Sequence, residues 1–297
     1  MKIKSSMHLT LSPEFKKLRG EYDLIKTELA KLVSERDILT ETVKKNLEAL
    51  YIIKIGALEY KLFCTECDAS RLRRKIELIQ ARLNRAEKIS VKFLLLIKVQ
   101  LDSEYQKWEQ EIKDLYAGIE SSKHRLSSLL TPAQSKKLQD LYRRLVKKLH
   151  PDVNPNLSDN QKILWHRLIE AYKSADIEEL ITIELLIKDI TDDMFSETDE
   201  AAKTAAANAA AVLERIKKEI NYIKEKVYKV ALEIKEIKNQ FPFTIQADLE
   251  NKAWVNQKNA ETLVKIEEAS KRKSDLLKVI DDLLLGNAGF YTARADA

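Results

Sequence analysis

Residues 213–237, LERIKKEINYIKEKVYKVALEIKEI, show most clearly what kind of fold this chain adopts. Apolar residues recur there in unbroken steps of three and four, at Leu213, Ile216, Ile220, Ile223, Val227, Val230, Ile234 and Ile237. This spacing puts the apolar side chains on one stripe of an α-helix, while Lys and Glu occupy the other faces. Residues 213–237 are therefore predicted to form a helix that packs against another helix.

The composition of the whole chain favours long helices. Only five glycines and five prolines interrupt 297 residues, and 33% of the residues are charged. The apolar residues recur at helical spacing rather than in alternation, so little of the chain is suited to a sheet. We predict an all-α fold of long coiled-coil helical hairpins that flank a smaller helical hairpin.

Charge and hydropathy limit the classes of partner. The net charge of +5 arises from 52 basic and 47 acidic residues, which are interleaved as on solvated helix faces. We therefore expect no nucleic-acid partner. No stretch reaches the roughly 18 apolar residues that cross a membrane, and the start MKIKSSMHLTLSPEF lacks the apolar centre of a signal peptide. A soluble cytoplasmic protein without a membrane partner is expected.

Residues 13–130 are predicted to form a coiled-coil helical hairpin, with an outgoing stretch 13–86 and a returning arm 91–129. A heptad seam runs from Phe15 to Cys67, with polar interruptions at Arg36 and Asn46 that weaken packing but can set the register. The returning arm covers only about half of the outgoing stretch at about 1.5 Å per residue. The remainder needs another cover: a second copy of the chain in a homodimer through the coiled coils, the C-terminal helices, or a fold-back near Gly56.

The C-terminal part is predicted to form a second antiparallel helical hairpin over residues 213–286. Pro242 lacks an N–H donor and restricts Phe241 before it, so the first helix turns there and a second, of about 40 residues, follows. Three further segments are predicted as a flexible N-terminus (1–12), an acidic and Ala-rich connection (191–212) and a disordered tail (287–297).

Residues 131–190 read as a separate module. Thr131 to Gln134 and Ser158 to Gln161 are capping boxes, which predict one helix to Leu149 and a second to about Ser174. Pro151 stops the first helix, so two antiparallel helices are joined by a short polar loop. The apolar stripe of the first helix contains Leu138, Leu141, Tyr142, Leu145 and Leu149. Its opposite face carries the cations Lys136, Arg143, Arg144, Lys147 and Lys148.

The stretches LYRRLVKKLHPDVNP (141–155) and WHRLIEAY (165–172) resemble the second and third helices of the J-domain of DnaJ-type co-chaperones. The first combines Tyr-Arg-x-Leu with His-Pro-Asp and x-Asn-Pro, and the second has Ala-Tyr six and seven residues after an aromatic. The resemblance covers residues 131–175. It implies that His150, Pro151 and Asp152 contact a DnaK-type chaperone and promote its ATP hydrolysis. The cations of the first helix would dock on an acidic surface of that ATPase. The resemblance also implies a client protein, whose identity the sequence does not give.

An alternative interpretation keeps the module as a structural element. The segment SSKHRLSSLL (121–130) stands where the first J-domain helix carries Asp-Tyr-Tyr-x-x-Leu-Gly, and His-Pro-Asp is also an efficient helix stop. A relic J-like hairpin would then only pack between the coiled coils of an adaptor protein. Because a docking surface has to be accessible, burial of the loop 150–152 would favour this interpretation.

An enzyme is not expected. Cys64 and Cys67 form C-x-x-C without a second pair or a βαβ context, and they continue the apolar seam as helix thiols. The four histidines, His8, His124, His150 and His166, lack metal-ligand spacing. No Ser or Cys lies in a recognisable nucleophile context, so we predict no catalytic residue, cofactor or metal site.

Overall fold

The computed structural model of the chain describes residues 13–187 and 205–286, and every element in these ranges is helical. The predicted all-α class is therefore confirmed for the described residues. The chain divides into two compact units, one of Met1–Lys45 with Leu129–Thr244 and one of Asn46–Ser128 with Ile245–Ala297. Each unit has its own core.

The outgoing stretch is helical without a break from Pro13 to Leu83. Its parts are α2 (Pro13–Ile38), the π-helical turn η1 (Leu39–Lys44), α3 (Lys45–Tyr51), the π-helical turn η2 (Ile52–Gly56) and α4 (Ala57–Leu83). The heptad seam predicted here lies in the cores: Tyr22 and Leu29 are buried in the first unit, and Cys67 in the second. The apolar periodicity therefore identified the packed face of these helices.

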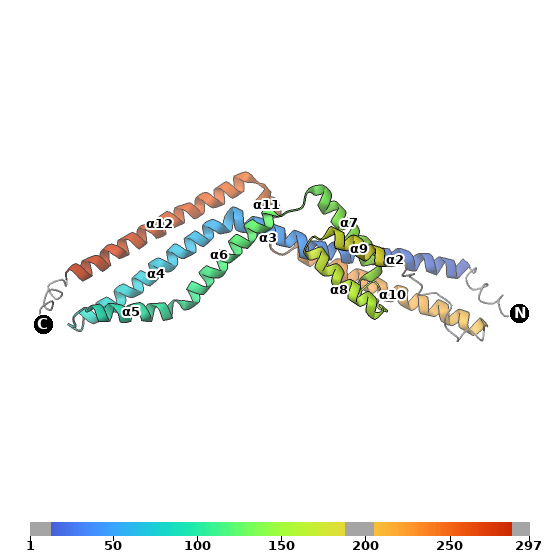
Figure 1. The fold of residues 1–297 in the computed structure, drawn as a ribbon, viewed down its shortest axis with the longest axis horizontal. Helices are drawn as coiled ribbons and strands as arrows, with labels where there is room; N and C mark the ends of the chain where they lie inside the picture. Colours follow the sequence, from blue (N-terminus) through green and yellow to red (C-terminus); the bar gives the residue numbers. More distant parts are fainter. Residues whose placement is uncertain (1–12, 188–204, 287–297) are drawn as a thin grey trace. The chain divides into compact units, whose positions relative to one another are not determined.

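In the first unit, α10 (Ala205–Lys238) lies along α2 and runs in the same direction (Figure 1). Three ion pairs report the register: Lys217–Glu14 at 3.3 Å, Lys224–Glu21 at 2.8 Å and Lys238–Glu35 at 2.8 Å. The last two join residues 203 positions apart, and the first has the same offset. A constant offset at heptad steps is the pattern of a parallel coiled coil.

Three shorter helices pack in this unit as well: α7 (Pro132–Leu149), α8 (Asp159–Lys173) and α9 (Ile177–Leu186). Both α2 and α9 pack on α7, and α9 also contacts α8 (Figure 1). Leu145, Leu168, Leu180 and Ile216 are all buried in the shared core. The hairpin of α7 and α8 is thus covered by the adjacent α9 and by α2 from a distant part of the chain, and Leu130 also packs against this core.

In the second unit, α4 packs along α12 (Lys252–Leu285) and also contacts α5 (Val91–Glu104) and α6 (Gln106–Ser127) (Figure 1). Lys273 pairs with Asp68 at 2.6 Å, and Arg272 with Glu66 at 3.8 Å. The turn predicted at Pro242 is present, since α10 ends at Lys238 and η3 (Phe243–Ile245) with α11 (Gln246–Glu250) precedes α12.

The helix pairing differs from the predicted hairpin over residues 213–286. α10 packs on α2, and α12 packs on α4, in parallel rather than as an antiparallel pair. The C-terminal helices thus cover the outgoing stretch, which was one of the three covers considered from the sequence. The returning arm, α5 and α6, covers only the second half of that stretch. Periodicity shows which face of a helix is apolar, but many helices present an equivalent face, so it does not identify the partner.

Some predictions concern residues outside the described ranges. These are the flexible N-terminus (1–12), the tail (287–297), the last residues of the module (188–190) and the first part of the connection (191–204). The Ala-rich end of that connection belongs to α10, which begins at Ala205. No helix in the described residues is long and apolar enough to cross a membrane.

Candidate functional site

The His-Pro-Asp loop is positioned by two helix caps. Thr131 Oγ1 accepts a hydrogen bond from the Gln134 N–H, and the Gln134 side chain accepts one from the Thr131 N–H, so the predicted capping box starts α7. Ser158 and Gln161 start α8 in the same way. At the other end of α7, His150 has extended backbone angles (φ −71°, ψ 130°), as expected for a residue before proline. The loop therefore begins where the sequence predicts.

Two tyrosines join the helices of the hairpin. The rings of Tyr142 in α7 and Tyr172 in α8 stack with their centroids 4.1 Å apart. The Tyr142 hydroxyl donates to Asp37 Oδ2 at 2.8 Å, and the Tyr172 hydroxyl accepts from Thr42 Oγ1 at 3.1 Å. Both hydroxyls are thus paired with groups of the outgoing helix, and burial raises the pKa of both tyrosines.

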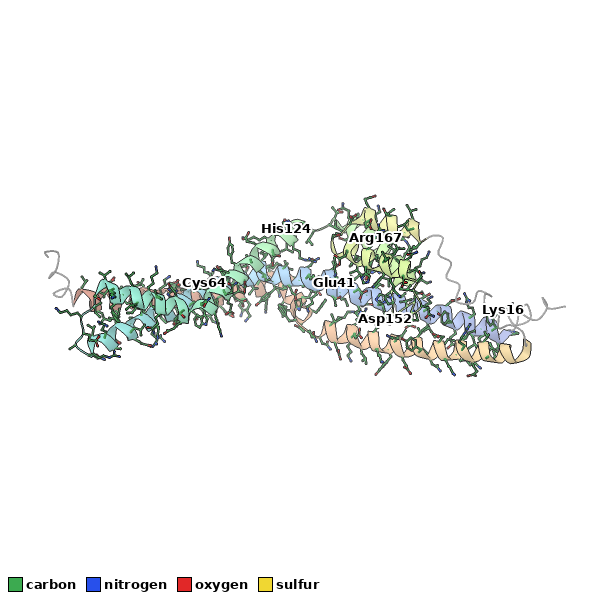
Figure 2. All side chains as sticks on the ribbon, turned by 60° about the horizontal axis from the view of Figure 1, so that its bottom comes forward. Lys16, Glu41, Cys64, His124, Asp152 and Arg167 are labelled. Atoms are coloured by element: carbon green, nitrogen blue, oxygen red, sulfur yellow. The ribbon has the colours of Figure 1, made fainter. Side chains whose placement is uncertain are left out.

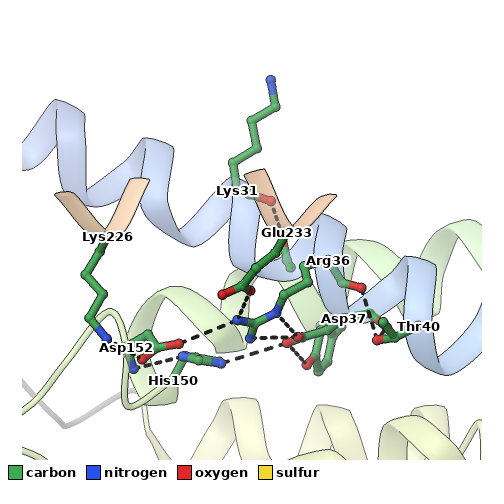
Figure 3. A network of polar contacts seen from close by, with 10 residues as sticks. Lys31, Arg36, Asp37, Thr40, His150, Asp152, Lys226 and Glu233 are labelled. Carbon is green, nitrogen blue, oxygen red and sulfur yellow. Dashed lines mark hydrogen bonds and ion pairs between the residues drawn. The ribbon is translucent and has the colours of Figure 1, made fainter. Parts of the chain in front are cut away.

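The imidazole of His150 is buried, with only 5% of the residue exposed. Its ring meets the ring of Trp165 edge to face, with centroids 4.5 Å apart. Nδ1 accepts a hydrogen bond from the Asp152 N–H at 2.9 Å, so a neutral ring carries its proton on Nε2. Nε2 lies 3.9 Å from Asp37 Oδ2 (Figure 3). Burial lowers the pKa of His150 to about 4, although the carboxylates of Asp37 and Asp152 oppose this shift.

Asp152 faces two long helices of the same unit. Figure 2 shows Asp152 beside these helices. Its carboxylate pairs with Lys226 of α10 at 3.1 Å and with Arg36 of α2 at 3.7 Å (Figure 3). Burial opposes ionisation of Asp152, but the hydrogen bond from Lys226 and the surrounding positive charge outweigh it and lower the pKa. Arg36 also pairs with Glu233 of α10 at 3.2 Å. The loop is therefore tied to α2 and α10 by ionic contacts.

Asp37 links these groups into one network. Its Oδ1 accepts hydrogen bonds from Arg36 Nε at 3.1 Å and Nη2 at 3.0 Å, while Oδ2 accepts from Tyr142 and faces His150 (Figure 3). The carboxylate is mostly covered, with 15% of its side chain exposed. Several partners converge on one charge, which compensates for its partial removal from water.

Pro151 and the predicted docking cations are accessible. Pro151 is exposed, and so are all five cations of α7, namely Lys136, Arg143, Arg144, Lys147 and Lys148. Arg144 pairs with Glu184 of α9 at 2.7 Å, and Arg143 with Asp140 at 3.2 Å. Lys136, Lys147 and Lys148 form no ion pair with the residues that the structure describes. The face opposite the apolar stripe is thus a solvated, mainly basic surface.

The three residues of the loop differ in exposure. Pro151 is exposed and Asp152 is partly exposed, whereas His150 is buried. The reason lies in α2 and α10, which bring Asp37, Arg36 and Lys226 to the loop.

Nothing in the sequence indicated that Asp37, Arg36 and Lys226 contact the loop. Arg36 was visible only as a polar residue in an apolar seam, and Lys226 resembles any other lysine on a solvated helix face.

The remaining predictions about chemistry concern the cysteines and metals. Cys67 is buried, and burial raises the pKa of its thiol to about 11, so it is a poor nucleophile at neutral pH. Cys64 is half-buried and both thiols are free. Within residues 13–187 and 205–286, no group of three or more His, Cys, Asp or Glu side chains is arranged to hold a metal ion.

Comparisons of the chain with protein-family models, with curated proteins and with solved structures find no match. The resemblance to J-domains therefore rests on the sequence of residues 141–155 and 165–172.

Proposed function

We propose that residues 131–187 form a J-domain-like co-chaperone module that recruits a DnaK-type chaperone and promotes its ATP hydrolysis. The observation that carries the proposal is a His-Pro-Asp loop that closes a helical hairpin beside five exposed cations on α7. In this proposal the catalytic groups belong to the partner, and this chain is not an enzyme. The coiled-coil segments would place the module or hold a client.

The cations of α7 would guide the encounter. Charges on an accessible helix face accelerate and orient binding to an acidic surface, and this effect weakens as salt screens it. Lys136, Lys147 and Lys148 are the strongest candidates because no described partner neutralises them. Pro151 lies at the end of the same helix and is already exposed.

Contact through Asp152 requires an exchange of partners. Lys226 and Asp152 each have 31% of their side chain exposed, and partly solvated ion pairs of this kind contribute only about 1 kcal/mol. A partner cation could therefore replace Lys226 at low cost. We infer that α10 restrains the loop and that its release favours stimulation of the ATPase.

The test is a steady-state ATPase assay of a DnaK-type chaperone with the full chain. We expect stimulation by the native protein, a loss of it on His150→Gln and on the double change Lys147→Ala with Lys148→Ala, and an increase on Lys226→Met. Lys173→Ala, an exposed lysine of α8, and Lys224→Met, which loses only its pair with Glu21, serve as matched controls. Absence of stimulation by both the native chain and Lys226→Met would reject the proposal.

Burial of His150 and the ion pairs of Asp152 favour a second function. In this alternative the loop is a structural joint that fixes the hairpin to α2 and α10, and the protein is an adaptor or scaffold. His150→Gln would then lower the stability of the chain while no variant stimulated an ATPase. The two functions are distinguished by the response to Lys226→Met, which would activate a co-chaperone but only weaken a joint.

A further inference from the structure

Helix α5 in the second unit carries apolar residues on both of its sides, although the residues that the structure describes cover only one of them. Ile97 and Leu101 are buried against α4 and α12. On the other side Val91, Leu95 and Val99 follow one another at steps of four, and their exposed fractions are 64%, 58% and 66%. A helix that is apolar all round is normally enclosed by other helices. The exposed stripe therefore lacks a cover within the described residues.

The stripe borders a groove of about 480 Å³ between α4, α5 and α12. Leu72, Leu94 and Ile97 contribute apolar surface to it, and Leu277 of α12 adds a further exposed side chain. Its volume falls within the range of about 300–1,000 Å³ that is typical of sites holding a ligand. A groove between helices that exposes apolar side chains suits the apolar face of a further helix.

The charges around the groove are mainly positive. Arg71, Lys75, Lys98 and Lys273 line it, against a single acidic residue, Asp68. Arg71 is occupied by Asp102 and Glu109, and Lys273 by Asp68. Lys75 and Lys98 have no ion-pair partner among residues 13–187 and 205–286. They are available to acidic side chains that flank the apolar face of a docked helix.

The same charges disfavour a second copy of α5 as the cover. An antiparallel pair centred on Leu95 would place Lys92 opposite Lys98 of the other copy, and a parallel pair would place each lysine beside its own equivalent. Like charges at such an interface oppose association. We propose that the groove between α4, α5 and α12 binds an amphipathic, acidic helix of another protein, with Leu95 as an apolar contact and Lys75 and Lys98 as charge contacts. This site is independent of the His-Pro-Asp module.

The test measures fluorescence anisotropy of labelled peptides with the full chain. The probes are a panel of designed helices of about 18 residues, some 27 Å long, with Leu on one face at differing spacings and Glu beside it. We expect saturable binding by at least one member, weakened by salt. Leu95→Ser and Lys98→Glu should each reduce the affinity about tenfold or more, which is the change expected for one buried leucine or one charge reversal.

The controls distinguish binding in the groove from non-specific binding to exposed leucines or to positive charge. Leu24→Ser alters a leucine in the first unit that is even more exposed than Leu95, and should leave binding unchanged. Peptides with Lys in place of Glu should not bind. The proposal is overturned if no Glu peptide binds or if the Lys peptides bind as well. It also fails if Leu95→Ser affects only self-association or only binding to vesicles of phosphatidylcholine and phosphatidylserine.

Discussion

Asp37 is the residue on which the contacts of the loop converge. It receives hydrogen bonds from Arg36 and Tyr142 and faces His150, and its carboxylate is largely covered. Removal of a charged acceptor leaves buried donors without an equivalent partner, and each hydrogen bond to a charged group contributes about 1.5–3 kcal/mol.

We expect Asp37→Asn to lower the free energy of unfolding by about 2 kcal/mol. The measurement is urea denaturation followed through Trp165, in a background with Trp108→Phe and Trp254→Phe so that the signal comes from the first unit. The matched control is Asp23→Asn on the same helix, where an exposed carboxylate accepts a 3.4 Å contact from Arg19. That change should cost no more than about 0.5 kcal/mol. Equal effects of the two variants would show that the network does not stabilise the fold.

The low pKa of His150 links stability to pH. In the folded chain burial lowers the pKa to about 4, whereas the unfolded chain has the ordinary value of 6.5. Between these values the unfolded state binds more protons, so stability is retained above pH 6.5 and is lost as the pH falls toward 4. From pH 6.5 to 5 the loss is about 2 kcal/mol, at about 1.4 kcal/mol per pH unit.

Urea midpoints at pH 7 and pH 5 measure this loss. His150→Gln should flatten the dependence in this window, because glutamine does not titrate. His166→Gln, which replaces an exposed histidine of α8, should preserve it. A native-like pH dependence in His150→Gln would assign the effect to other groups.

Among the packed helices, the parallel register of α2 and α10 rests on charge pairs at heptad steps. Glu14, Glu21 and Glu35 meet Lys217, Lys224 and Lys238. Glu28 occupies the intervening step, where the constant offset places Ala231 instead of a lysine. Helix α2 thus contains both a position that tests the register, Glu21, and a control position, Glu28.

Glu21→Lys should destabilise the first unit by about 0.5 kcal/mol, because it replaces a partly exposed attraction by a repulsion. Adding Lys224→Glu should restore most of this loss, and a double-mutant cycle measures the coupling. Glu28→Lys should show no coupling to Lys224→Glu of similar size. An absence of coupling between positions 21 and 224 would contradict the parallel register.

For the chain as a whole, the expected oligomeric state depends on which helices cover the apolar faces of α2 and α4. The apolar face of α2 is packed by α10 and that of α4 by α12, so a second copy is not needed to cover the outgoing stretch. We expect light scattering at micromolar concentration to report the mass of one chain, 34.3 kDa. A mass of two chains that Leu95→Ser reduced to one would identify α5 as the contact. A dimer that Leu95→Ser did not dissociate would indicate that the two copies associate through the coiled-coil seams.

The local features were predictable from short stretches of sequence. The helical class, both capping boxes, the end of α7 at Leu149 and the division of α7 into a buried stripe and a cationic face all agree with the structure. The caps and the helix end depend on interactions between residues within a few positions of one another, such as a side chain that caps its own helix or a proline that lacks a donor. The stripe follows from the helical spacing of the apolar residues. Such local interactions can be predicted from a short stretch of sequence, whatever the rest of the fold.

The polar contacts of the loop with α2 and α10 depend instead on residues more than 70 positions away. Lys226 is 74 positions from Asp152, and Asp37 is 105 positions from Tyr142. Helices with three-four spacing present interchangeable apolar faces, so the pairing of α10 with α2 follows from packing of the folded chain and not from the pattern of either helix. Asp37 and Arg36 of α2 and Lys226 of α10 meet the loop because these two helices, once paired, both pass beside it, and neither sequence pattern alone specifies that arrangement.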